Sequence, residues 1–368
     1  MAAASDTTSA WTRFRRNPTA MAGLVFIVLM AIVALAGPFI RPDHTPNAND
    51  QQPALARQKP GFEVRMVRVP EGGAGFTWSS LIKQYGWANG YRDYPTSGWE
   101  WRGDTLRIWE WSPTADRADF TDVTLAAFGP GVSREQVENE FVINRSFVLG
   151  TDRFGRDLQS RLMAGTAISL SIGLVAVTVS LLIGLTLGAV AGFFGGRTDK
   201  LVMWLVSVVW SIPTMLLVMA ITMAFGKGFW KVFIAVGLTM WVEVARVVRG
   251  QVLSLREKEF IEACKVLGYG PVRTIVRHVL PNVTGPVIVV AAGNFASAIL
   301  VEAGLSFLGI GAQVPTPSWG GIIKEHYAFI TTDLAYLAFT PGLLIMLLVL
   351  SFILVGNGLR DAVDVRLN

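Results

Sequence analysis

Six apolar runs, each about as long as a lipid bilayer is thick, constrain the fold of this chain most strongly. They lie near residues 20–40, 168–193, 201–225, 229–248, 284–308 and 335–356. A helix needs about 20 residues to cross a hydrocarbon layer of roughly 30 Å, and it satisfies its own backbone polar groups there. The composition agrees, because 52% of the 368 residues are hydrophobic and only 16% are charged. We therefore predict an all-α polytopic membrane protein with six transmembrane helices.

The basic residues predict how these helices are oriented. If the N-terminus is cytoplasmic, the short outer segments contain only Lys227, Lys231 and Lys324. The inner segments then contain fourteen basic residues: Arg13, Arg15, Arg16, Arg197, Lys200, Arg246, Arg249, Arg256, Lys258, Lys265, Arg273, Arg277, Arg360 and Arg366. Basic residues concentrate on the cytoplasmic side of membrane proteins, so we expect both termini to be cytoplasmic.

The positive charge of the chain does not indicate a nucleic-acid partner. The net charge is +5, but residues 41–160 carry 14 Lys and Arg against 16 Asp and Glu. The excess therefore belongs to the membrane part, where the orientation rule accounts for it. The single cysteine, Cys264, excludes an internal disulfide and a cysteine-based zinc cluster.

The first apolar run has a second interpretation. Arginines, an apolar run and Ala34-Leu35-Ala36 are also the pattern of a cleavable signal peptide. The run at 20–40 is long for that purpose, which favours a retained first transmembrane helix. A mature N-terminus at Gly37 would identify a signal peptide instead.

The segment from 41 to 165 is polar and interrupts the membrane part, so we expect an extracytoplasmic insertion there. Residues 62–66 and 105–108 alternate as half-buried strands do, and Ser133 with Gln136 predicts a capped helix through about Phe141. These signals predict a small α+β domain, the alternative being a partly disordered insertion. Disordered chains are poor in aromatic residues, whereas this segment contains Trp78, Trp87, Trp99, Trp101, Trp109 and Trp111. The tryptophans suit a small core, the membrane interface or contact with a delivered ligand.

A polar loop at residues 255–281 separates the fourth and fifth apolar runs. Phe260, Ile261, Cys264 and Leu267 recur with the period of a helix, and Gly268 follows where a left-handed cap would end it. A second amphipathic turn follows, which Pro281 is expected to stop. Two short helices exposed to the cytoplasm suit a docking surface, the alternative being an amphipathic loop that lies on the membrane.

The order Glu262-Ala263, Gly268 and Leu280-Pro281 resembles the EAA loop of permease subunits in ABC importers. That resemblance implies that Glu262, Ala263, Gly268, Leu280 and Pro281 contact a partner ATPase. Cys264 and His278 depart from the common form of the loop. The run of residues 277–282 is itself similar to the peptide-importer branch, so the second departure indicates a subfamily.

Further segments are similar to the dipeptide and oligopeptide (nickel) permeases. They are Gly150-Thr151-Asp152-Arg153-Phe154-Gly155-Arg156-Asp157, the run 302–309, the run 315–320 and Gly358-Leu359-Arg360-Asp361-Ala362. In the first, Asp152 and Asp157 suit structural salt bridges better than a catalytic pair, and Trp319 in the third suits an interfacial anchor. At the C-terminus Asn357 and Val365 depart from the pattern. The resemblance covers about 10–40 and 148–368, not the insertion.

This resemblance implies the fold of a type I ABC importer permease. The expected division is a cytoplasmic tail at 1–19, the first transmembrane helix at 20–40, the insertion at 41–165, a five-helix permease core at 166–358 with its coupling loop at 255–281, and a cytoplasmic tail at 359–368. Within the core, Gly184, Gly188 and Gly192 recur every four residues, which predicts a flat helix face for close packing.

The chain shows no recognisable catalytic constellation. Its three histidines share no motif with a serine or with Cys264, and no Gly-x-x-x-x-Gly-Lys-Ser/Thr loop is present. We therefore expect no enzyme activity, no metal site and no cofactor on this chain, with ATP and Mg²⁺ bound by a partner ATPase. A membrane-anchored enzyme is disfavoured for the same reason.

Two polar residues in the fifth apolar run are the candidates for the translocation path. Asn294 and Glu302 lie on a helix that also carries Gly293, Ser297 and Gly304, and polar residues inside spans usually face the bundle interior or a water-filled path. The alternative is that Asn294 bonds a neighbouring helix while Glu302 lies in interfacial water.

Together these features imply a multi-pass permease of the bacterial inner membrane that imports peptides or similar solutes by alternating access. Its implied partners are a second permease subunit, two ATP-binding subunits, an extracytoplasmic substrate-binding protein and membrane lipid. Nickel chelates and oligosaccharides are alternative cargoes. A self-contained channel or secondary carrier is the alternative of another class.

Overall fold

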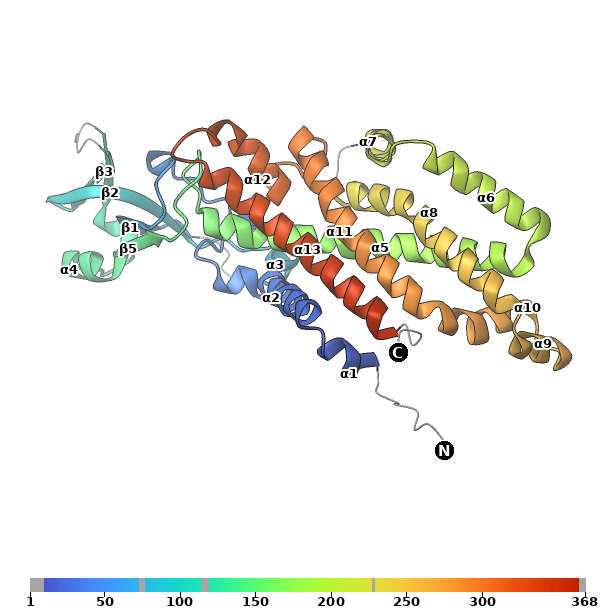
Figure 1. Cartoon of the computed structure of the whole chain (residues 1–368). Coiled ribbons are helices and arrows are strands. Elements are labelled where there is room, and N and C mark those ends of the chain that lie inside the picture. The colour runs from blue at the N-terminus through green and yellow to red at the C-terminus, as the bar shows by residue number, and fades with distance from the viewer. Residues whose placement is uncertain (1–9, 73–76, 114–118, 227–228, 364–368) are drawn as a thin grey trace.

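The computed structural model describes residues 10–72, 77–113, 119–226 and 229–363. The outer parts of the two predicted tails, at 1–9 and 364–368, lie outside these residues, as do Lys227 and Arg366. Figure 1 shows an elongated bundle of helices with a β-sheet at one end. The short helices of the 255–281 loop lie at the opposite end of the bundle (Figure 1).

The helical part is built around the long helix α5. Its helices are α1 (Ala10–Arg15), α2 (Pro18–Ile40), α5 (Leu158–Phe194), α6 (Gly196–Trp210), α7 (Thr214–Phe225), α8 (Phe229–Arg256), α9 (Glu259–Val266), α10 (Pro271–Thr274), α11 (Leu280–Leu308), α12 (Trp319–His326) and α13 (Tyr336–Val363). Helix α5 packs mainly along α8, and also against α11 and α2, while α13 packs against α11 and α2. The core therefore lies between α5, α8 and α11.

The glycine stripe predicted on the second apolar run makes this packing possible. A β-carbon on Gly184 would lie 2.5 Å from Val244 Cβ, and one on Gly188 would lie 2.6 Å from Ala245 O. A β-carbon on Gly192 would lie 2.8 Å from Val252 Cβ. Each distance is shorter than a van der Waals contact, so α5 and α8 approach backbone to backbone. The predicted packing face is confirmed.

Four helices in the described part of the chain are long and apolar enough to cross a membrane. They are α2, α5, the continuous helix Pro271–Leu308 and α13, and a fifth span results if α6 and α7 are taken together. The run at 201–225, predicted as one transmembrane helix, forms two helices, because α6 and α7 meet at 90°. Pro213 lies at the break; it has no backbone N–H and disfavours helix at the residue before it.

The predicted end of the insertion and the predicted end of the permease core both differ from the helix ends in the structure. The insertion was expected to end at 165, but α5 already begins at Leu158, because the Asp157 side chain caps it by accepting a hydrogen bond from Ser160 N at 2.9 Å. The core was expected to end at 358, whereas α13 continues to Val363. Hydrophobic runs miss polar helical turns at their ends, which explains both differences.

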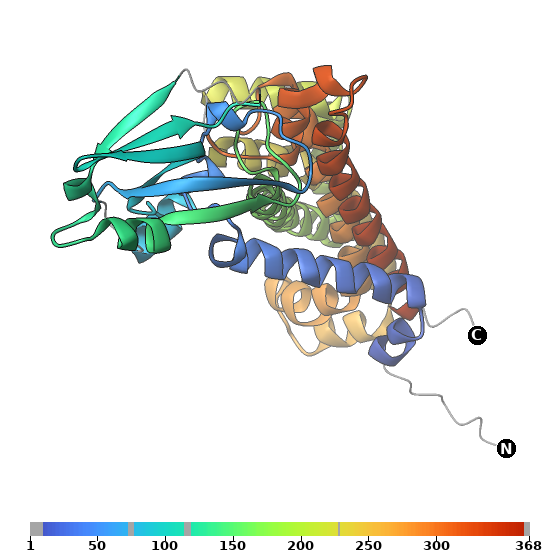
Figure 2. The ribbon, with the colours of Figure 1, turned by 90° about the vertical axis from the view of Figure 1, so that its left-hand side faces the viewer.

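The insertion contains a five-stranded antiparallel sheet. Its strands are β1 (Phe62–Pro70), β2 (Tyr91–Arg102), β3 (Thr105–Glu110), β4 (Phe120–Thr124) and β5 (Val142–Phe147), in the order β4-β3-β2-β1-β5. The strands predicted at 62–66 and 105–108 are present, and Ser133 with Gln136 forms the predicted capping box. That box begins α4 (Arg134–Gln136), which a π-helical turn continues to Phe141. Figure 2 shows the sheet standing away from the bundle.

The tryptophans of the insertion have different environments. Trp99 and Trp101 pack against a sheet core that includes Val67, Leu106 and Ile108. Trp87 instead stacks on His44, with ring centroids 5.0 Å apart, and Trp78 on α3 (Trp78–Gln84) is exposed. A single role for all six therefore does not hold.

Buried polar bonds join the insertion to the first helix. Arg41, which follows α2, is fully buried, and its guanidinium donates to the backbone oxygens of Asp43, Thr45 and Tyr85 at 2.6, 2.8 and 2.5 Å. The Tyr85 hydroxyl in turn donates to Ala34 O within α2, and burial raises the pKa of this hydroxyl to about 12. The end of α2 is therefore fixed against the insertion.

Candidate coupling loop and buried polar groups

Gly268 ends helix α9 with a left-handed cap. Its φ is +74°, a conformation that costs a residue with a β-carbon roughly 1–2 kcal/mol. Gly268 N donates to Lys265 O, and Tyr269 N donates to Cys264 O, both at 3.0 Å. These two bonds form a Schellman motif. The helix end predicted from the sequence is confirmed.

Helix α9 is anchored by a narrow apolar stripe. Ile261 and Cys264 are buried, and Ile261 packs in a cluster with Val248 and Val252 of α8. The predicted apolar face was wider than this. Phe260 is 40% exposed and Leu267 is 67% exposed, because a helix of eight residues that packs on one neighbour buries only one side.

The outer side of α9 combines acidic and apolar groups. Glu262 and Ala263 are exposed, and Val266 is 88% exposed. Val272 and Val276 on the following turns are also exposed. Exposed apolar residues grouped on one surface indicate a site of protein or membrane contact. Together with Leu267, these residues form the exposed apolar surface of the coupling loop.

Pro281 does not stop the second turn, contrary to the prediction. Residues Pro271–Leu308 form one continuous helix, in which a π-helical turn at Ile275–Val279 precedes Leu280 and Pro281 at the start of α11. A π turn shifts the hydrogen-bond pattern by one residue, so the missing N–H of Pro281 can be accommodated without a break. Leu280 is half-buried and Pro281 is exposed.

His278, which departs from the common form of the loop, faces Tyr269. Their rings stack with centroids 5.8 Å apart, and the Arg273 guanidinium lies 4.2 Å from the Tyr269 ring centroid. These contacts join the glycine-containing turn to the start of α11. The sequence marked His278 only as a departure; its partner lies nine residues earlier.

Helix α8, which leads into the coupling loop, is tied to the end of α5 and the start of α6. Arg249 forms a bidentate ion pair with Asp199 in the first turn of α6, with a distance of 2.7 Å from Nη2 to Oδ2. Arg256 Nη1 lies 3.4 Å from Gly192 O. No local pattern predicts either contact, because the partners of Arg249 and Arg256 lie 50 and 64 residues away along the chain.

The two candidates for the translocation path are both buried inside this chain. Asn294 is 3% exposed, and its Nδ2 donates to Met240 O on α8 at 3.3 Å. Glu302 is 1% exposed and accepts from Ser306 Oγ at 2.5 Å. Ser306 Oγ also accepts from Ala312 N at 3.0 Å. Asn294 thus joins two helices and Glu302 orders the turn after α11, while a role in the path stays a prediction for both.

The loop before α5 contains an ion-pair network that the sequence revealed only in part. The Arg156 guanidinium lies 2.5 Å from Asp152 Oδ2 and 2.5 Å from Glu325 Oε2 on α12. Arg161 approaches the same two carboxylates at 3.6 Å. The structural role predicted for Asp152 is thus an ion pair, whereas Asp157 acts as a helix cap. Glu325 was missed because it lies far along the chain in a short helix.

Two carboxylates and an imidazole come close together in this network. Single ligand atoms of Asp152, Glu325 and His326 lie within 4.8 Å of one another. The guanidinium groups of Arg156 and Arg161 both form ion pairs with the carboxylates of Asp152 and Glu325. Positive charge at these positions opposes a cation, so the cluster suits an internal ion-pair network.

The sequence predicted that Trp319 anchors the chain at the membrane interface, but the structure places it elsewhere. Its side chain is fully buried and donates from Nε1 to Leu162 O on α5 at 3.0 Å. A β-carbon on Gly165 would lie 2.7 Å from this indole. Trp319 therefore packs α12 onto α5, and Gly165 is the small residue that makes room for its indole.

Asp157, which lies just outside the α5 span, is buried at the entry of the chain into the bundle. Burial raises the pKa of its carboxyl group, and hydrogen bonds from the Ser160 hydroxyl and backbone N–H lower it by a smaller amount. The net effect is a carboxyl group that ionises less readily than usual.

The chain is similar in sequence to a known protein family. Residues 184–368, about half of the chain, match the family described as binding-protein-dependent transport system inner membrane component. The chain belongs to that family. Residues 5–60 of this permease also match the N-terminal transmembrane domain of oligopeptide transport permease C. The protein is therefore a membrane permease component of an ABC importer and not itself an enzyme.

Individual relatives of this permease align with more than half of its length. The oligopeptide transport system permease protein OppC of Bacillus subtilis is 35% identical over 67% of this chain and 82% of its own length. The dipeptide transport system permease protein DppC of Alkalihalophilus pseudofirmus is 41% identical over 59% of this chain and 71% of its own. An inward-facing structure of the MetNI methionine ABC transporter aligns at 18% identity with a TM-score of 0.46, covering 55% of this chain and 96% of that chain.

Proposed function

We propose that this permease forms part of the path through which peptides or similar small solutes enter the cell, by alternating access driven by ATP on partner subunits. The names of its relatives support the cargo class, since they are oligopeptide, dipeptide and glutathione permeases.

The observation that carries the coupling role is the exposed surface of α9. Glu262 and Ala263 are exposed on a helix whose other side is anchored to α8 through Ile261. Gly268 holds the turn that follows in a fixed conformation. An anchored helix with exposed acidic and apolar groups suits the groove of a partner protein. We infer that Glu262, Ala263, Gly268, Leu280 and Pro281 form or position the ATPase contact.

The proposed topology has six spans. Helix α8 is counted as a span because its residues 229–248 are largely apolar, while its arginines gather toward the coupling loop. The bent pair of α6 and α7 is counted as one. With the coupling loop in the cytoplasm, the sheet at the other end of the bundle becomes extracytoplasmic (Figure 1). Both termini are then cytoplasmic, as the distribution of basic residues predicts.

The proposed assembly contains a second permease subunit, two ATP-binding subunits that bind ATP and Mg²⁺, and an extracytoplasmic substrate-binding protein. Asn294 and Glu302 stay candidates for the path, acting in this proposal through the helix contacts that they make. The insertion stands at the outer end of the bundle, where it would gate the path or extend the docking surface for the binding protein. Loss of ligand delivery on deletion of residues 50–140 would support that role.

Substitutions in the coupling loop test the proposed function. Glu262→Lys reverses an exposed charge, and Gly268→Asp places a β-carbon at a φ of +74°. Both variants should remain in the membrane and lose ATP-driven uptake. Gly270→Asp is the matched control, because Gly270 caps α10 with a φ of −66° and aspartate is a favourable cap. Normal uptake by both loop variants would exclude the coupling role.

A self-contained channel or carrier predicts a different result. Such a protein would be purified from its native membrane without an ATPase, and its uptake would survive removal of ATP. Co-purification of an ATPase that Glu262→Lys abolishes would decide for the importer.

A further inference from the structure

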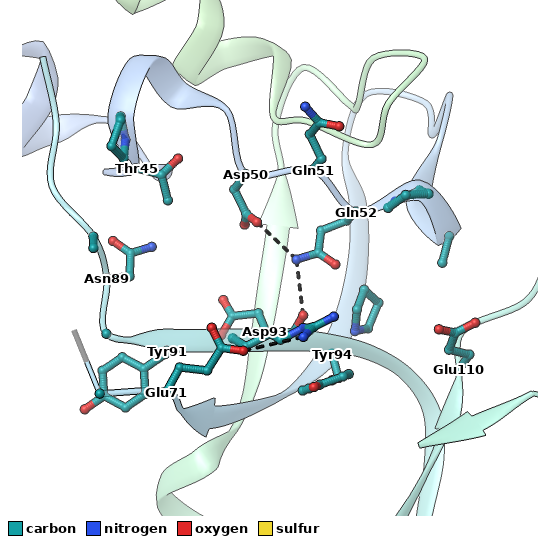
Figure 3. A pocket seen from close by; sticks show the side chains of 18 residues that line it. Thr45, Asp50, Gln51, Gln52, Glu71, Asn89, Tyr91, Asp93, Tyr94 and Glu110 are labelled. Atoms are coloured by element: carbon teal, nitrogen blue, oxygen red, sulfur yellow. Dashed lines mark hydrogen bonds and ion pairs between the residues drawn. The ribbon is translucent and has the colours of Figure 1, made fainter. Parts of the chain in front are cut away.

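The insertion contains a cavity of about 660 Å³ that the proposed function does not yet use. It lies between the segment at 45–54, which follows α2, and the first half of strand β2 (Figure 3). Small-ligand sites in proteins typically enclose roughly 300–1,000 Å³. The cavity is thus the right size for a small molecule, whereas a docked protein domain would need a broader surface.

Carboxylates dominate the charged groups of this cavity. Asp50, Glu71, Asp93 and Glu110 line it, and Arg92 is the one basic residue in the described lining. Figure 3 shows these acidic side chains on different sides of the same space, with Asp50 above strand β2, Glu71 on the left and Glu110 on the right, opposite Thr96. Groups that converge from separate elements favour a guest of positive charge.

The internal ion pairs leave part of this negative charge uncompensated. Arg68 holds Asp93 at 2.9 Å, and Arg145 holds Asp50 at 3.0 Å. Neither Arg68 nor Arg145 lines the cavity. Glu110 has no ion-pair partner in the described part of the chain, and Glu71 meets only the exposed Arg92 at 3.5 Å.

Two tyrosines supply aromatic surface next to the carboxylates. Tyr91 and Tyr94 both line the cavity from strand β2. Arg68 lies 5.4 Å from the Tyr91 ring centroid, and Arg92 lies 5.2 Å from that of Tyr94. Both rings therefore already receive cations. An ammonium group bound between a carboxylate and an aromatic ring gains from both contacts.

The polar frame of the cavity is fixed before any guest arrives. Gln52 Nε2 donates to Asp50 Oδ1 at 3.2 Å and to Asp93 O at 3.1 Å. Asp50 N donates to Asp43 Oδ2 at 3.0 Å. Burial raises the pKa of the Asp50 carboxyl group although Arg145 opposes this, as expected where a carboxylate lacks full compensation. A frame held in this way loses little entropy on binding.

We propose that this cavity binds a small ligand with more than one ammonium group, in which Glu71 and Tyr91 contact one group and Glu110, opposite Thr96 of β2, contacts another. The choice of a short basic peptide as the representative ligand rests on the proposed function. The cavity would then hold cargo outside the membrane bundle, on the permease itself.

The test measures binding of trilysine to the assembled importer in lipid nanodiscs, without its binding protein, by isothermal titration calorimetry. The double variant Glu71→Gln/Glu110→Gln keeps the size of both side chains and removes their charge. We expect its Kd for trilysine to rise at least fivefold, and its affinity to depend less on salt than that of the unmodified importer. Glu63→Gln, an exposed strand carboxylate outside the cavity, is the matched control and should bind normally.

Three outcomes would overturn the inference: no saturable binding to the unmodified importer, equal affinity in the double variant, or equal affinity for N-acetylated, amidated triglutamine. Uptake of labelled peptides by cells that carry the importer separates this result from the proposed function. If cells take up peptides normally but any of the three outcomes is found, only the proposed cavity site is excluded. Cavity-dependent binding without any peptide uptake removes the proposed cargo and retains the site.

Discussion

Arg249 and Asp199 form a bidentate ion pair that joins the coupling end of α8 to the first turn of α6. The two side chains are only 29% and 19% exposed, and Asp199 also lies where the positive end of the α6 dipole favours a carboxylate. Helix α9 begins ten residues after Arg249. In the proposed function, a displacement of the 255–281 loop would therefore reach α6 through this pair as well as through the backbone.

Removing one partner of this pair should loosen the coupling. We expect Asp199→Asn and Arg249→Gln each to cost about 1 kcal/mol, which is roughly a fivefold change in an equilibrium. ATP hydrolysis per transported molecule should rise accordingly in purified importer. The exchange Asp199→Arg with Arg249→Asp should restore coupling in part, because the pair reforms against an unfavourable dipole. Single variants that couple ATP hydrolysis to transport as well as the unmodified protein would show that the pair has no mechanical role.

The glycine contact between α5 and α8 predicts a stability effect. Gly188→Ala places a β-carbon 2.6 Å from Ala245 O, so the helices must separate at a cost of about 1–3 kcal/mol. A lower midpoint of thermal unfolding in detergent measures this. Gly250→Ala on α8 is the control, since a β-carbon there meets no atom within 4 Å and alanine favours helix.

The ion-pair network before α5 predicts that one substitution strongly lowers the stability of the protein. Arg156→Met leaves the buried Asp152 and the partly buried Glu325 beside the single guanidinium of Arg161, and breaking a buried pair costs about 3–5 kcal/mol. We expect little mature protein in the membrane. Arg153→Met in the same loop removes an exposed guanidinium that stacks on Phe154 and should accumulate normally. Equal levels of the two variants would contradict a structural role for the network.

Asp157 predicts a dependence of stability on pH. Burial raises the pKa of Asp157 in the folded state. Its favourable contribution to the free energy of unfolding is therefore complete at pH values below the usual carboxyl pKa, and it declines as the pH rises through the raised pKa. Asp157→Asn keeps an acceptor for Ser160 N and should remove this decline. Asp157→Ala removes the helix cap and should lower the free energy of unfolding by about 1 kcal/mol at every pH. Unfolding midpoints between pH 4 and pH 7 distinguish the three proteins.

Local patterns were visible in the sequence, whereas contacts across the chain were not. The glycine stripe, the Gly268 cap and the Ser133 capping box depend on neighbouring residues or on one helix period, and the structure confirms each. The partners of Arg249, Arg156 and Trp319 lie 50, 169 and 157 residues away. No local pattern specifies such pairs.

Backbone geometry explains the remaining differences. Proline is expected to end a helix, and at Pro213 it does mark the 90° bend. At Pro281 the preceding π turn absorbs the same defect, and a π turn has no clear sequence signature. Asn294 and Glu302 were recognised as polar residues inside a span, but the sequence could not tell a residue that joins two helices from one that faces water.

The π turn before Pro281 leaves 38 residues, Pro271–Leu308, in a single helix. At 1.5 Å per residue such a helix is about 57 Å long, more than the thickness of the hydrocarbon layer. Any tilt of this rod about its middle moves its two ends in opposite directions. In the proposed topology, widening of the bundle at its cytoplasmic end would therefore accompany narrowing at its outer end.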